Sequence, residues 1–440
     1  MQLVALLALL QPSIATVASP RPTIPITPAR WHNERRAAIL EAHPEVAKLT
    51  TPEPSTLPIL AACNAAQIGC SLAAAHLPAA ALVPFGIFVG GTLSLWQFAL
   101  LHDVKHGTAV LPSGVNPNDV LFAGSLPSLF GYFLYLRYGH LSHHKDFGKR
   151  PLRDLFNSEQ ANFEDGDALF IAHRQQMPLD EPHKRVGFFG KEEVGGLGLS
   201  ISRTIYSLLW IDPPGSPRES DAAGSPFARY VSYIVPAWNA AVYSFSMCFE
   251  RSALVFGGGV VPALVGRNYF FPNKPRAFHD TCANYARISL AIQLALFAAA
   301  GPAALLYLFW AEVGWQLPVH PASAMFVSNH PSLEAPEGAA AGSVRGCQPT
   351  TSCYIAPWFD WLCCFSNFHT EHHDFPDVPA LRLRELRDMA APFYADSTLA
   401  GARDGWLETM RRTFAGRQFY ACGGVNVEGV KTAPRESNQL

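Results

Sequence analysis

The stretch LPILAACNAAQIGCSLAAAHLPAAALVPFGIFVGGTLSLWQFALL, from Leu57 to Leu101, contains no Asp, Glu, Lys or Arg. A helix needs about 20 apolar residues to cross the hydrocarbon core of a bilayer, so this stretch is long enough for two spans. Pro78 lies between them and favours a turn. We therefore predict a transmembrane hairpin with helices over Leu57–Leu77 and Ala79–Leu101.

A second run without Asp, Glu, Lys or Arg extends from Ile288 to Ala311, and its apolar character continues through Glu312 to Leu317. Gly301 and Pro302 interrupt this run near its middle. Such a Gly-Pro pair favours a turn, which predicts a second transmembrane hairpin with shorter arms. The two hairpins together make four spans.

Two further segments are rich in aromatic residues, Leu121–Leu136 and Tyr230–Cys248, and contain one proline each. We predict that they lie in the headgroup layer as interfacial helices. The alternative is that one of them spans the bilayer. An odd number of spans would then place the segments before and after it on opposite sides of the membrane.

The composition of the whole chain agrees with a membrane protein. Of its 440 residues, 49% are hydrophobic and 15% charged, whereas soluble proteins have about 25% charged residues. The net charge of −2 gives no indication of a nucleic-acid partner. Nine scattered cysteines without a C-x-x-C pair are typical of reduced thiols. The predicted fold class is an all-α integral membrane protein.

The chain outside the hairpins divides by composition into tails and one amphipathic segment. Residues 1–30 begin with an apolar run and resemble a targeting segment or a disordered tail. Residues 31–56 alternate apolar and charged positions, with a break at Pro44, and are expected on the membrane surface. Residues 57–421 form the membrane domain, and residues 422–440 a disordered C-terminal tail.

Three histidine boxes carry eight of the 16 histidines: HDVKH from His102 to His106, HLSHH from His140 to His144, and HTEHH from His369 to His373. On a helix, positions i, i+3 and i+4 share one face, so the imidazoles of each box converge. A single H-x-x-x-H is more often a pair of solvated histidines than a metal site. Three boxes beside apolar segments are hard to attribute to composition.

The basic residues predict which side of the membrane holds the boxes. Lysines and arginines flank both hairpins, whereas neither hairpin turn carries one. By the positive-inside tendency these flanking segments face the cytosol. Two complete hairpins return the chain to its starting side, which gathers the three boxes in one cytosolic cap.

The number and type of these residues indicate a metal centre. Imidazole suits Fe, Zn and Cu, and a structural zinc site needs only four ligands. Eight histidines in three groups therefore imply two metal ions. Soluble di-iron proteins use mostly carboxylates, whereas an all-imidazole ligand set resembles that of the integral-membrane di-iron oxygenases.

The boxes and their flanks resemble those of the membrane fatty-acid desaturase superfamily. HTEHHDFPDVP (369–379), RYGHLSHHKDFG (137–148) and RRAAILEAHPEVAKL (35–49) are similar to signatures of its sphingolipid Δ4-desaturase, or dihydroceramide desaturase, group. The segment HPASAMFVSNH (320–330) is similar to another, although Met325 and Asn329 replace its histidine and glutamate. The resemblance implies nine iron ligands: His102, His106, His140, His143, His144, His330, His369, His372 and His373.

The resemblance also implies an activity, cofactors and partners. The family uses O₂ and two irons to introduce a trans double bond into the long-chain base of dihydroceramide, at the endoplasmic reticulum membrane. No H-P-G-G haem element occurs in the chain, so a separate cytochrome b5 and its NADH-dependent reductase would supply electrons. We expect cytochrome b5 to dock near Lys145, Lys149 and Arg150.

Three carboxylates lie inside or beside the boxes: Asp103, Glu371 and Asp374. Each is a candidate for orienting a ligand imidazole by accepting its second N–H. The alternative interpretation is an ordinary carboxylate on a helix surface. The other histidines, including His32, have no such pattern and are interpreted as ordinary surface or core residues.

Two alternative functions remain open at this point. The same iron site serves C4-hydroxylation of a sphingoid base or desaturation of an acyl lipid, because these reactions share the first hydrogen removal. A membrane metal transporter is an alternative of another class. Transport favours ionisable ligands within the spans, yet the first charge-free stretch holds only His76 and the second holds no histidine.

Overall fold

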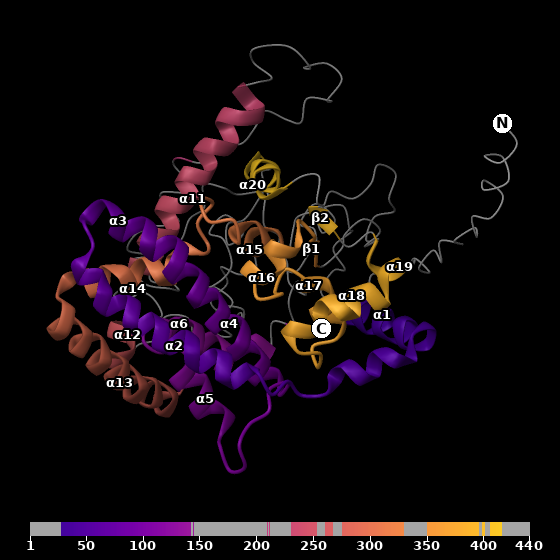
Figure 1. The fold of residues 1–440 in the computed structure, drawn as a ribbon, viewed down its shortest axis with the longest axis horizontal. Helices are drawn as coiled ribbons and strands as arrows, with labels where there is room; N and C mark the ends of the chain where they lie inside the picture. The colour runs from indigo at the N-terminus through magenta and orange to yellow at the C-terminus, as the bar shows by residue number, and fades with distance from the viewer. Residues whose placement is uncertain are drawn as a thin grey trace, which may run out of the picture.

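The computed structural model describes residues 28–141, 144, 209, 211, 230–252, 260–266, 275–329, 350–395, 398–400 and 405–415, and this part of the chain is mostly helical (Figure 1). The elements of the first half are α1 (Pro28–Ala42), η2 (Pro44–Thr50), α2 (Thr56–Ala73), η3 (Ala74–His76), α3 (Ala79–Pro84), η4 (Phe85–Gly90), α4 (Gly91–His106), α5 (Pro117–Gly124) and α6 (Phe130–Tyr138). Those of the second half are η8 (Tyr230–Ile234), α11 (Val235–Ser252), α12 (Val260–Leu264), α13 (Arg276–Ala300), α14 (Pro302–Gly314), α15 (Ser323–Ser328), β1 (Ser352–Cys353), α16 (Pro357–Leu362), α17 (His369–Asp374), η9 (Ala380–Arg382), α18 (Leu383–Met389), α19 (Ala391–Tyr394), β2 (Thr398–Ala400) and α20 (Gly405–Ala415).

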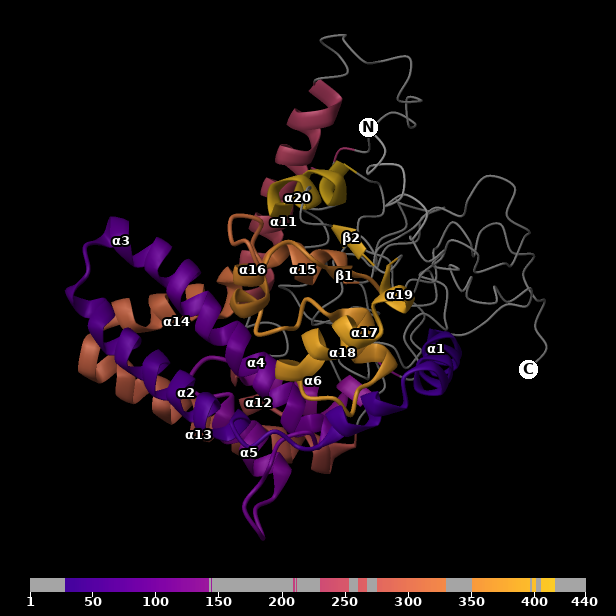
Figure 2. The ribbon, with the colours of Figure 1, turned by 45° about the vertical axis from the view of Figure 1, so that its right-hand side comes forward.

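The arrangement separates the hairpins from the third histidine box. Helices α2, α4, α13 and α14 lie together on one side, and α17 and α18 lie with α1 on the other (Figures 1 and 2). The strands β1 and β2 pair in parallel, with Ser352 opposite Thr398.

The first hairpin closely matches its prediction. Its arms run over Thr56–His76 and Ala79–His106, and both are long and apolar enough to cross a membrane. The second arm continues beyond Leu101, so the first histidine box forms its last turns. It ends at Gly107, whose φ of 74° is the left-handed conformation that glycine adopts easily at a helix C-terminus.

The second hairpin turns at Gly301, as predicted, but its arms differ from the expected ones. Helix α13 is a candidate span that begins at Arg276, 12 residues before Ile288. Helix α14 has 13 residues; at 1.5 Å per residue it covers about 20 Å, less than the roughly 30 Å hydrocarbon core. The described residues therefore contain three helices with the length of a span, and the fourth arm is shorter.

The two hairpins pack so closely that their backbones touch. A Cβ atom added at Gly90 would lie 2.6 Å from the Cβ of Ala311, and one added at Gly314 would lie 2.7 Å from the Cα of Ile87. Small residues allow such close approach between helices in a membrane, where dispersion contacts replace the hydrophobic effect. This contact holds α14 against η4 and the start of α4.

Gln67 joins three membrane helices through buried hydrogen bonds. Its Nε2 donates to the carbonyl oxygen of Gly90 (3.0 Å) and to Ser94 Oγ (2.8 Å). Its Oε1 accepts from the hydroxyl of Tyr307 (2.7 Å). The bonds connect α2, α4 and α14, and they satisfy an amide that would otherwise be costly to bury in hydrocarbon.

We expect the substitution Gln67→Leu to lower the thermal unfolding temperature in detergent, because it leaves the Tyr307 hydroxyl and the Ser94 side chain without this partner. Interhelical hydrogen bonds in membranes contribute roughly 0.6 to 1.7 kcal/mol. Gln293→Leu is the matched control, since Gln293 makes one longer bond, to the carbonyl of Pro127 (3.3 Å). Equal losses for the two variants would contradict the prediction.

The aromatic segments differ from the interfacial helices that we predicted. Leu121–Leu136 forms two helices, α5 and α6, rather than one, and seven consecutive residues of α6 from Phe130 to Leu136 are buried. This segment is protein core, and its prediction as an interfacial helix was wrong. In contrast, η8 and α11 expose four large apolar side chains, those of Tyr233, Ile234, Trp238 and Phe245.

The N-terminal segment has a partner other than the one expected. It is helical and breaks at Pro44, as predicted, but its apolar positions Ile39, Val46 and Leu49 are buried. They belong to a core cluster with residues that follow the third box, among them Phe375 and Leu386. The prediction that this apolar face meets the membrane surface was therefore wrong, because the face packs on protein.

Candidate metal centre

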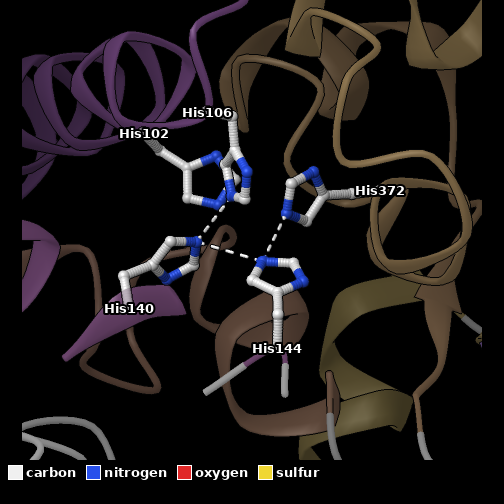
Figure 3. A group of neighbouring side chains, drawn as sticks. All are labelled: His102, His106, His140, His144 and His372. Atoms are coloured by element: carbon white, nitrogen blue, oxygen red, sulfur yellow. Dashed lines mark hydrogen bonds between the residues drawn. The ribbon is translucent and has the colours of Figure 1, made fainter. Parts of the chain in front are cut away.

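Five imidazoles converge on one point (Figure 3). One nitrogen of each ring lies within 4.8 Å of the corresponding nitrogen of every other; the five are His102, His106, His140, His144 and His372. The Nε2 atom of His140 lies 2.8 Å from that of His106 and 3.0 Å from that of His144. The Nε2 atom of His144 lies 3.0 Å from that of His372. Histidines from all three boxes therefore meet.

The geometry of these nitrogens fits a metal ion. A neutral imidazole carries one N–H and one lone pair. The Nε2 atoms of four rings form a row in the order His106, His140, His144 and His372, and the two inner atoms each face two others. The Nε2 atom of a neutral ring offers either one proton or one lone pair, so hydrogen bonds alone cannot satisfy all three contacts. A cation that accepts four lone pairs satisfies them together, and imidazole nitrogen suits Fe, Zn and Cu.

The surroundings of His372 favour its neutral ring, the form that binds a metal ion. Burial, and then the neighbouring imidazoles, lowers the pKa of His372 well below its usual value. The hydroxyl of Tyr135 lies 3.3 Å from Nδ1 of His140, on the side of the ring away from the cluster. Such a contact to the second nitrogen orients a ligand imidazole.

The remaining histidines of the third box lie at the same place. The ring centre of His373 is 4.2 Å from that of His144 and 4.5 Å from that of His369. Seven of the nine proposed ligands are thus brought together. His143 and His330 lie outside the described residues, as do Lys145, Lys149 and Arg150 of the expected docking site.

Local structure explains how each box presents its rings. His102 and His106 are four residues apart on α4, so they share a face. His140 follows the buried helix α6. The third box begins α17 directly after a turn in which Cys364 and Phe365 adopt left-handed conformations, with φ of 46° and 59°. Non-glycine residues in this region cost about 1–3 kcal/mol each and cluster near functional sites.

The three carboxylates beside the boxes are all buried, so the interpretation as helix-surface groups was wrong. Asp103 accepts from the backbone N–H of Ala380 at 3.1 Å. Glu371 accepts from Ser352 Oγ (2.6 Å) and from the Tyr354 hydroxyl, and burial raises its pKa to about 7. Their hydrogen bonds in the described part of the chain hold segments around the third box.

Asp374 binds two residues that our sequence interpretation did not assign to the site. Its oxygens lie 2.6 Å from Nδ1 of His32 and 3.1 Å from Nε of Arg35. His32 had been interpreted as an ordinary surface or core histidine. The available signal was complementary charge: Arg35 and Arg36 in one signature, Asp374 and Asp377 in the other.

Comparison with known proteins identifies relatives of the chain. The family model described as Fatty acid desaturase matches residues 212–400, and that described as Sphingolipid Delta4-desaturase matches residues 28–55. The chain is 29% identical over 136 residues to the human sphingolipid delta(4)-desaturase/C4-monooxygenase, a match covering 30% of this chain and 38% of the relative. It is 23% identical over 376 residues to the sphingolipid delta(4)-desaturase of Schizosaccharomyces pombe, covering 82% of this chain and 77% of that one.

The rat sphingolipid delta(4)-desaturase/C4-monooxygenase is 32% identical to the chain over 111 residues, or 25% of this chain and 30% of the relative. The matched regions therefore span well under two thirds of the mammalian relatives and over two thirds of the yeast one. No solved structure matches the chain.

Proposed function

We propose that the chain, which is similar to the fatty-acid desaturase family and to its sphingolipid Δ4-desaturase group, is a membrane oxidoreductase that introduces a trans double bond into the long-chain base of dihydroceramide. The observation that supports this most is the group of buried and half-buried imidazoles at the end of a candidate membrane span. Such a place brings a lipid chain in the bilayer within reach of a metal centre.

The proposed cofactor is a pair of iron ions held by the nine histidines named above. The donor set supports this assignment, because the nearby carboxylates are engaged elsewhere. Asp103 binds a backbone N–H, Glu371 binds two hydroxyls, and Asp374 binds a histidine and an arginine. Within the described part of the chain, imidazoles are therefore the groups beside the centre that remain to bind the metal. Once bound, the irons would supply the O₂-dependent oxidising power that removes hydrogen from a methylene group.

The chain itself holds and shields the reacting position. Phe98 lies next to His102, with ring centres 6.3 Å apart, and Trp315 stacks on Phe98 at 5.8 Å. Tyr132 contacts both Phe98 and Trp315. This aromatic group borders the histidines on the side of the hairpins. It would exclude water and orient an apolar chain, which decides the carbon that reacts.

We place the enzyme in the endoplasmic reticulum membrane with four spans, α14 being the shortest, and with the histidines on the cytosolic side. The helix lengths and the distribution of basic residues support this topology. A separate cytochrome b5 with its NADH-dependent reductase is the proposed electron donor. Its proposed docking residues are Lys145, Lys149 and Arg150.

The proposal is tested by lipid mass spectrometry of yeast cells that lack sphingolipid desaturase and hydroxylase. We expect Δ4-unsaturated long-chain bases in cells that express the chain, and none in cells that express His372→Ala at the same level. Immunoblots check expression. Absence of this product with well-expressed, iron-loaded protein and cytochrome b5 present would refute the substrate assignment.

C4-hydroxylation is the second candidate, because the human and rat relatives are named as both desaturase and C4-monooxygenase. The same experiment separates the two reactions, since a 4-hydroxylated base differs from the unsaturated base by the mass of one water molecule. An unsaturated acyl chain on a glycerolipid would instead favour acyl-lipid desaturation. Metal transport is disfavoured, because the clustered histidines lie at the end of a candidate span rather than along it.

A further inference from the structure

The N-terminal helix α1 lies against α17, which carries the third histidine box (Figure 2). It belongs to the segment that the Sphingolipid Delta4-desaturase model matches, residues 28–55. More than 320 residues of sequence separate the two helices. Their contact therefore shows where the tertiary structure places this segment relative to the metal centre.

Asp374 is the centre of this contact and directly follows His373. One carboxylate oxygen lies 2.6 Å from Nδ1 of His32, and the other accepts from Nε of Arg35 at 3.1 Å. The side chain of Asp374 has no solvent-accessible surface, and those of His32 and Arg35 are 5% and 12% exposed. A buried carboxylate needs such partners, and removal of one leaves an uncompensated charge.

Both partners are themselves held in place. Arg35 Nη2 donates to the carbonyl oxygen of Phe393 at 2.8 Å, and its guanidinium lies 5.2 Å from the ring centre of Tyr394. A guanidinium fixed at two points binds a carboxylate with defined geometry. The end of α17 is thereby connected to α1 and to α19.

His32 contacts the third box from its other side. Its Nε2 lies 3.3 Å from Thr350 Oγ1, which donates to Thr370 Oγ1 at 3.2 Å. Its ring centre lies 5.0 Å from that of His373. Since both ring nitrogens of His32 have protein partners, neither is left to bind a metal ion. His32 is a neighbour of the ligands and not one of them.

We propose that His32 and Arg35 are positioning residues for the metal centre: through Asp374 they hold α17 in the orientation that directs His369, His372 and His373 at the metal. This inference rests on the proposed function, because it assumes that these histidines bind iron. It assigns the N-terminal segment a role in metal binding instead of attachment to the membrane surface. Loss of groups that orient metal ligands typically lowers metal affinity by about 10- to 100-fold.

The test measures ferrous iron binding by the purified full chain in detergent, by titration against a chelator of known affinity. Arg35→Gln is expected to weaken iron binding about 10- to 100-fold. The matched control is Arg36→Gln, because the neighbouring Arg36 pairs with Asp377 instead of Asp374, and both side chains of that pair are partly exposed (31% and 44%). The control should bind iron like the unmodified chain.

A second pair of variants separates positioning from folding. His32→Asn retains a donor close to the position of Nδ1 and should largely restore iron affinity, whereas His32→Ala should not. The Mössbauer spectrum of bound iron should change in His32→Ala and stay unchanged in His32→Asn. His32→Ala should also lower the unfolding temperature of the iron-free protein, because Asp374 loses a buried partner. A change in unfolding temperature alone, with the spectrum and affinity intact, would refute the inference.

The outcomes also distinguish this inference from the proposed function. Unchanged iron affinity in both Arg35→Gln and His32→Ala overturns the positioning role whatever lipid the enzyme acts on. Equal weakening in Arg35→Gln and Arg36→Gln overturns it as well, since it would reflect general loss of structure. A lipid product other than a Δ4-unsaturated base would refute the substrate assignment and leave the iron titrations interpretable.

Discussion

His106→Ala is expected to abolish stable iron binding and to leave no detectable desaturation. His106 Nε2 lies 2.8 Å from His140 Nε2, within the group of converging nitrogens. Removal of an outer group that only orients a ligand costs about 10- to 100-fold in metal affinity, so removal of a ligand should cost more. The measurement is iron per polypeptide after gel filtration in detergent, with product analysis on the same preparation.

The control for this prediction is His76→Ala. His76 ends the first arm of the first hairpin, is exposed and lies in none of the boxes. The control should bind as much iron as the unmodified chain. If His106→Ala also retained its full iron content, the five converging nitrogens would not be the metal site. If it lost iron but kept activity, the bound iron would not be the catalytic metal.

Gly90→Ala is expected to destabilise the membrane domain although it adds a single methyl group. The new Cβ would lie 2.6 Å from the Cβ of Ala311, 3.1 Å from the Cα of Ala311 and 3.1 Å from a ring atom of Tyr307. Backbone atoms cannot swing aside as a flexible side chain does, so the hairpins must separate. Overpacking of this kind costs about 1–3 kcal/mol. Thermal unfolding in detergent measures the loss.

Gly69→Ala is the matched control, because a Cβ at Gly69 meets no atom within 4 Å. Alanine is favoured over glycine inside a helix by up to about 1 kcal/mol. The control should therefore be neutral or slightly stabilising, so the two substitutions should have opposite effects. Helix α4 carries His102 and His106, and iron content should fall together with stability in Gly90→Ala. A stabilising effect of Gly90→Ala would contradict the close packing of η4 against α14.

The helices of the first hairpin and the spacing of the boxes were predictable from local sequence. Backbone polar groups have no water to bind in the hydrocarbon core, so an apolar stretch of this length crosses it as a helix. The first-hairpin bounds differ from the predicted ones mainly where α4 continues to His106. Absence of charge marks the lipid-facing part of a helix but not its polar end. For the same reason the prediction began the second hairpin at Ile288 and missed the first turns of α13.

Burial and pairing were not predictable in the same way. The aromatic residues of α6 fit an interfacial helix by composition, yet neighbouring helices cover them on all sides. The carboxylates Asp103, Glu371 and Asp374 were identified as candidates, but their partners were not. The reason is that hydrogen-bond partners depend on which distant segments meet. The sequence carried only complementary charges in two separate signatures, which do not specify the pairs.

The sequence by itself determined that this is a helical membrane protein and which residue types a metal centre would use, because hydrophobic length and ligand spacing act within a few turns of chain. Only the tertiary structure decided which histidine nitrogens converge and that His32 and Arg35 bind Asp374. The contact between His32 and Asp374 joins residues 342 positions apart. Its existence follows from the packing of α1 on α17, where complementary charges are buried together.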